Sequence, residues 1–160
     1  MTPEDALDYF VQQVREGNLR DYRLRIYYMN PMVMRSFSRQ VRSVNDLTRR
    51  GYEYRVIISG EGLFQPWAWD NALLNQINAD ALIPVENEST LTARIYYVFE
   101  TNRGRKIFDV AMFGDDNWSV FVNGIEFELD EIFYDIIRPH LPLTAVQQMD
   151  RFFELRRTSD

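Results

Sequence analysis

The sequence contains no cysteine, one histidine (His140) and one lysine (Lys106), and its other cationic residues are all arginines. Cysteine, histidine and lysine supply most protein nucleophiles, general bases and metal ligands. Arginine binds carboxylates and phosphates well but is a poor proton donor at neutral pH. This composition excludes disulfides, disfavours an enzyme, and gives no reason to expect a metal site or a cofactor.

The sequence also gives no reason to expect a signal peptide or a membrane-spanning segment. The N-terminal residues Met-Thr-Pro-Glu-Asp have neither the basic nor the apolar region of a signal peptide. No run approaches the 18 or so apolar residues of a membrane span. We therefore expect a cytoplasmic protein without a membrane segment. The length of 160 residues and the hydrophobic fraction of 46% favour a single globular domain over residues 1–160.

Hydrophobic periodicity predicts both strands and helices. Alternation with a period of two predicts strands, whereas apolar spacings of three and four predict helices. Asn123-Gly124 predicts a tight hairpin that pairs Val122 with Ile125. The expected strands are 22–29, 54–59, 91–100, 106–113, 118–122 and 125–129, and the expected helices are 3–16, 71–81, 132–137 and a C-terminal one. The fold class is α+β, a mixed but mostly antiparallel sheet of about six strands with N-terminal, central and C-terminal helices packed on it.

Residues 31–50 permit two interpretations. On a helix, their apolar residues share one side and Arg35, Arg39 and Arg42 share the other. We therefore expect one helix there, which would allow strands 22–29 and 54–59 to be parallel with a right-handed crossover. Valine and serine are mediocre helix formers, however. A break near Ser43, with a strand or loop followed by a short helix, stays open.

Charges of opposite sign are concentrated in different parts of the chain. Residues 15–55 hold ten arginines and four acids, residues 56–160 hold eight cations and 17 acids, and residues 109–135 hold acids only. The first explanation of this uneven charge is that the residues lie on solvated faces and have no specific role, as is true of most charged surface. The functional alternative is an acidic surface that docks a basic protein, since complementary potential raises association rate and selectivity. Its residues would be Asp115, Asp116, Glu126, Glu128 and Glu131.

Two tryptophans precede the central helix, and one of them is a candidate for an aromatic binding patch. Trp67 and Trp69 lie in a proline-containing connector, and Asp70 is placed to cap the helix that follows. Tryptophan is enriched in binding hot spots, but it also anchors loops to a core. If Trp69 packs inward, Trp67 is the exposed one.

We infer a non-enzymatic protein-interaction module that binds a basic protein through the acidic surface and the aromatic patch. A homodimer is left open. The first alternative is a small-molecule-binding or hydrolase-like protein with a sheet-lined pocket around Asp109, lined by Tyr97 and Phe99. The second and weaker alternative is anion or nucleic-acid binding by Arg35, Arg39 and Arg42, which the net charge of −6 disfavours.

Overall fold

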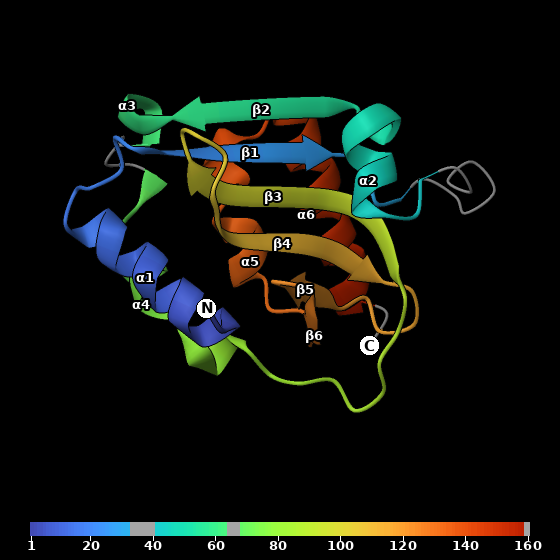
Figure 1. Cartoon of the computed structure of the whole chain (residues 1–160). Coiled ribbons are helices and arrows are strands. Elements are labelled where there is room, and N and C mark those ends of the chain that lie inside the picture. Colours follow the sequence, from blue (N-terminus) through green and yellow to red (C-terminus); the bar gives the residue numbers. More distant parts are fainter. Residues whose placement is uncertain (33–40, 64–67, 159–160) are drawn as a thin grey trace.

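One six-stranded antiparallel sheet organises the fold. The structure is a computed structural model that describes residues 1–32, 41–63 and 68–158 (Figure 1). The strand order is β2-β1-β3-β4-β5-β6. The strands are β1 Tyr22–Tyr28, β2 Tyr54–Ser59, β3 Leu91–Thr101, β4 Lys106–Gly114, β5 Val120–Val122 and β6 Ile125–Phe127.

Helices come before, between and after the strands, so the predicted α+β class is confirmed. Among the described residues, no helix has both the length and the apolar character needed to cross a membrane. The α-helices are α1 Pro3–Arg15, α2 Val44–Asp46, α3 Gly60–Leu63, α4 Asn71–Gln76, α5 Ile132–Asp135 and α6 Leu143–Thr158. Short turns of other helical types occur at Leu47–Gly51, Ala79–Ala81 and Arg138–His140.

Local sequence signals fixed several element ends. Thr2 caps α1 by accepting a hydrogen bond from the Asp5 backbone at 3.1 Å. Asp70 caps α4 by accepting from the Leu73 backbone at 2.7 Å. Asn123 and Gly124 take φ values of 50° and 81° in the β5–β6 turn, and Val122 pairs with Ile125 as predicted. The central helix is shorter than expected, because α4 ends at Gln76 and a 3-10 turn follows.

The prediction of one helix over residues 31–50 is wrong where the structure describes that region. Ser43 caps α2, and its side chain and that of Asp46 form a reciprocal capping box. Arg42, which directly precedes this cap, is not helical. Strands β1 and β2 are antiparallel, with Leu24 opposite Ile58, so the parallel arrangement does not form.

The main core lies on one face of the sheet, under α1, α5 and α6. Phe10 of α1 packs against Phe99 and Phe108, with ring centres 4.8 and 5.1 Å away. Tyr97 donates a hydrogen bond to the Phe133 carbonyl at the start of α5. In Figure 1, α5 and α6 lie behind the sheet. Alternate residues of β3 therefore point into this helix-covered layer.

The opposite face of the sheet carries a second, smaller cluster and a charged network. The cluster contains Tyr27, Met29, Val41, Leu47 and Ala93, and α2 with the turn that follows covers it at one end of the sheet (Figure 1). Beyond this cluster, Glu100 of β3 is buried and pairs with Arg23 and Arg25 of β1.

Candidate functional site

Several acidic residues lie at the β6 side of the sheet, where residues 83–90 run beside the β5–β6 hairpin. Pro84 forms a bridge with Phe127. The Glu128 backbone donates to the Ile83 carbonyl at 2.7 Å, and the Asn117 side chain donates to the Asn87 carbonyl at 2.7 Å. These bonds hold an irregular segment in place and cover the outer edge of β6.

Glu126 lies in the middle of this contact and is buried, with only 8% of the residue exposed. Its carboxylate accepts hydrogen bonds from the Ser89 backbone and hydroxyl, the Ser119 hydroxyl and the Asn117 amide. Burial by itself raises the pKa of this carboxyl, but the hydrogen bonds outweigh it and the pKa lies below its ordinary value. Glu126 therefore joins two segments and is not available as a surface charge, contrary to its predicted docking role.

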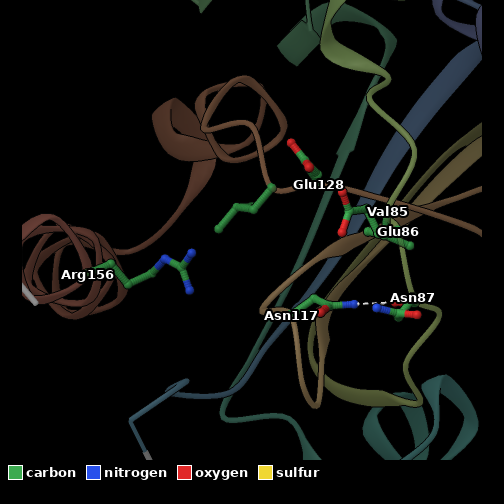
Figure 2. A pocket seen from close by; sticks show the side chains of 7 residues that line it. Val85, Glu86, Asn87, Asn117, Glu128 and Arg156 are labelled. Atoms are coloured by element: carbon green, nitrogen blue, oxygen red, sulfur yellow. Dashed lines mark hydrogen bonds between the residues drawn. The ribbon is translucent and has the colours of Figure 1, made fainter. Parts of the chain in front are cut away.

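An open groove lies between residues 85–87, the hairpin and α6, with a volume of about 390 Å³ (Figure 2). The Glu86 and Glu128 side chains line it on the sheet side, and Arg156 of α6 stands across from them. Four exposed carboxylates, which we call the acidic edge, belong to Glu86, Glu88, Asp116 and Glu128. The groove is lined by Val85, Glu86, Asn87, Asn117, Glu128, Leu129 and Arg156.

Trp118 supplies an exposed aromatic surface close to this edge. It has 43% of its surface exposed and a positive φ of 50°. Its ring lies 5.4 Å from that of Phe152 and 5.9 Å from that of Phe113. The Arg156 guanidinium lies 6.0 Å from the Trp118 ring centre, within the range of cation–π attraction. Trp118 is thus held by the core on one side while the other side faces solvent.

The other acids predicted for docking divide into two groups. Asp116 and Glu128 are exposed, as a docking surface requires. Asp115 is half-buried and accepts a hydrogen bond from Thr92, and Glu131 forms an ion pair of 2.6 Å with Arg157 of α6. The last two therefore already have partners within the protein.

The predicted aromatic patch is placed differently. Trp69 is half-buried, packs edge-on against Phe10 with ring centres 5.4 Å apart, and donates its indole N–H to the Leu63 carbonyl. It anchors a loop to the core. Trp67 lies outside the described residues.

The predicted pocket of Asp109, Tyr97 and Phe99 does not form. Tyr97 and Phe99 are fully buried on the helix-covered face, whereas Asp109 pairs in register with Val98 on the other face. The Asp109 carboxylate instead accepts a hydrogen bond from Tyr96 at 2.9 Å and lies 3.4 Å from the Lys106 ammonium. The sheet itself therefore separates Asp109 from Tyr97 and Phe99.

The predicted anion site is only partly described. Arg35 and Arg39 lie outside the described residues. Arg42 is exposed, but it precedes the Ser43 cap and so is not on the face of a helix. Its backbone N–H donates to the Asp46 carboxylate at 3.2 Å.

Glu86, Glu88 and Trp118 were not identified as site residues from the sequence. Glu86 and Glu88 have no periodic pattern around them that would have placed them beside the hairpin. Trp118 was assigned to a strand, yet β5 begins at Val120. In the described part of the chain, no cluster of three or more histidines and acids is arranged to hold a metal ion.

Comparison of the chain with protein-family models, with curated proteins and with solved structures found no match in any of the three. The function is therefore argued from the acidic edge, the groove and Trp118.

Proposed function

We propose that this chain is a non-enzymatic protein-interaction module that docks a partner protein with a basic surface at the acidic edge. The observation that carries the proposal is the groove, which is lined by Glu86 and Glu128 and by Arg156, whose guanidinium lies 6.0 Å from the exposed ring of Trp118. Its volume of about 390 Å³ is at the lower end of the range of roughly 300–1,000 Å³ for binding pockets.

The chemistry of the groove suits a basic side chain of the partner. A lysine or arginine that entered it would meet two carboxylates, and its aliphatic stem would contact Val85 and Leu129. Arg156 limits this attraction, but its guanidinium is held near the Trp118 and Phe152 rings. Trp118, as a rigid aromatic residue beside the charged rim, is of the type that dominates binding energy at interfaces.

Neither alternative function has comparable support. The hydrolase-like reading needed Asp109, Tyr97 and Phe99 in one pocket, and the sheet separates them. Nucleic-acid binding is disfavoured by the net charge of −6. The proposal includes a cytoplasmic location, which is predicted from the sequence alone, and a homodimer.

Charge reversal at the acidic edge tests the proposal. The double variant Glu86→Lys and Glu128→Lys leaves the Glu126 hydrogen bonds in place, whereas Glu126→Lys would put a cation in a buried site. Immobilised wild-type protein should retain a basic partner from a cytoplasmic extract at low salt and release it at high salt, because exposed charges are screened. The matched control is Glu4→Lys with Asp8→Lys, which reverses two exposed acids of α1.

We expect the control to retain the partner and the variant with Glu86→Lys and Glu128→Lys to lose it. The same loss should follow from Trp118→Ala, and calorimetry with the purified partner should give at least a tenfold weaker Kd, or about 1.4 kcal/mol. The proposal is contradicted if the wild type and the Glu86→Lys, Glu128→Lys variant retain the partner equally, or if the partner binds independently of salt.

A further inference from the structure

The two edges of the sheet differ in how they are protected. The outer side of β6 is covered by residues 83–90 through the Pro84–Phe127 bridge and the Glu128–Ile83 hydrogen bond. The outer side of β2 has no strand partner among the described residues. In Figure 1, β2 forms the upper border of the sheet. An edge strand of this kind is a template for a further strand, because it presents unpaired N–H and C=O groups.

Strand β2 has few of the features that block such pairing. Its sequence, Tyr-Arg-Val-Ile-Ile-Ser, contains one charge and no proline or glycine. It also exposes apolar surface on both faces. Ile57 is 50% exposed on one face, and Tyr54, Val56 and Ile58 on the other are only partly buried against the core. A strand added at this edge would cover apolar side chains above and below the sheet.

We infer that β2 pairs antiparallel with β2 of a second copy of this chain, about a two-fold axis at Val56. This inference rests on the homodimer in the proposed function and not on the acidic edge. In this register, Val56 of one copy lies opposite Val56 of the other, Arg55 opposite Ile57, and Tyr54 opposite Ile58. The two residues of each pair lie on the same face of the joined sheet. The aliphatic stem of Arg55 then covers the exposed Ile57 of the other copy.

The strand is complementary to itself in this register. Arg55, its one cation, lies opposite Ile57 of the other copy and not opposite the second Arg55. The exposed Ile57 is covered in both copies. Other centres on the strand are less suitable. An axis at Ile57 would place Arg55 opposite Ser59 and Tyr54 opposite Gly60, where α3 begins, so Arg55 would not cover Ile57. Because a two-fold contact is closed, assembly stops at the dimer.

Charge placement tests the interface. Ile57→Lys puts a lysine opposite Arg55 of the other copy, and like charges directly opposite destabilise a pair of strands. The control is Ile125→Lys, since Ile125 is equally exposed (51%) but lies in β6. We expect sedimentation velocity to give a wild-type dimer and an Ile125→Lys dimer, with dimerisation at least tenfold weaker in Ile57→Lys. A wild-type monomer at about 100 μM, or an unchanged Ile57→Lys dimer, overturns the inference.

The absence of cysteine allows a test of the register. Val56→Cys introduces the only thiol of the chain and places it next to its own copy across the axis, within reach of a disulfide. Val56→Cys should cross-link under mild oxidation much faster than Ile57→Cys or Ile125→Cys. Equal or faster cross-linking of either comparison variant contradicts the register. Ile57→Lys should still bind the basic partner, so failure of the dimer and failure of the acidic edge are distinguishable.

Discussion

The carboxylate of Glu126 accepts hydrogen bonds from both the backbone N–H and the hydroxyl of Ser89, which lies 37 residues earlier in the chain. This contact joins β6 to residues 83–90 and so builds the side of the molecule that carries the groove. A residue that looked like surface charge in the sequence is therefore a structural support for the site.

Replacement of Glu126 by glutamine should destabilise this side of the protein. The amide retains the shape, but it loses the charge that strengthens the bonds from Ser89 and Ser119, and its NH₂ group faces hydroxyl donors. We expect the free energy of unfolding to fall by about 1–3 kcal/mol, measured by urea denaturation. Glu128→Gln, at an exposed site two residues away, is the control and should change it little. Similar losses in the two variants would contradict the role of Glu126.

Gly114 should not tolerate alanine. A Cβ atom there would lie too close to the side-chain oxygens of Ser119, Ser89 and Glu126. Because these oxygens are fixed by hydrogen bonds, we expect Gly114→Ala to lower the free energy of unfolding by about 1–3 kcal/mol.

A second substitution separates this crowding from a general effect of the glycine. Removal of the nearest oxygen by Ser119→Ala creates space for the new methyl group. The double variant should therefore be more stable than the sum of the two single effects predicts. Strict additivity in the same denaturation experiment would show that the crowding is not the cause.

Removal of Glu100 should leave Arg23 and Arg25 without the carboxylate that they share. Burial raises the pKa of this carboxyl, but the hydrogen bonds from Arg25 and Arg23 more than compensate and the pKa is lowered. The carboxylate is buried while the guanidiniums are about 30% exposed, so solvent reduces the penalty for the arginines. We expect Glu100→Ala to lower the free energy of unfolding by about 2–3 kcal/mol. Arg23→Ala alone should have a smaller effect, because Arg25 still pairs with the carboxylate. The reverse order would contradict this network.

Stability should depend on pH through His140. Burial lowers the pKa of this imidazole to about 4 from an ordinary value of 6.5. The unfolded chain then binds a proton that the folded state does not, so stability is complete above pH 6.5 and falls as the pH drops toward 4. Between pH 6.5 and 5 we expect a loss of about 1.5 kcal/mol in the free energy of unfolding.

A variant and a direct titration check this dependence. His140→Phe should not show the loss between pH 6.5 and 5. The pKa values of Glu100 and Glu126 are also lowered by folding, so their contribution is present above pH 4.5 and is lost only below it. An NMR titration of wild-type His140 with a midpoint near 6.5 would contradict the prediction.

Features that depend on neighbouring residues were predictable from the sequence. Thr2 and Asp70 cap helices by accepting hydrogen bonds from residues three positions later, and Asn123 with Gly124 supplies the positive φ values of the hairpin turn. Propensity also favoured the correct alternative at Ser43, although the apolar spacing of residues 31–50 favoured one helix. There the capping box outweighed the periodicity.

The site residues depended on contacts between distant segments. Alternation within β3 and β4 separates each strand into two faces, but only the pairing of Val98 with Asp109 decides that Asp109 lies opposite to Tyr97. In the same way, nothing near Glu126 in the sequence indicates that Ser89 will cover it. Glu86 and Glu88 join the acidic edge because residues 83–90 are bound to the hairpin.

The sequence by itself determined the order and approximate positions of the six strands, the caps at the starts of α1 and α4, the α+β class and the separation of positive from negative charge. Only the tertiary structure decided which of the described carboxylates are buried, that Trp118 is exposed, and which edge of the sheet is covered. The physical reason is range: a cap or a turn is formed within about four residues of chain, whereas burial of a side chain is set by whichever distant segment packs on it.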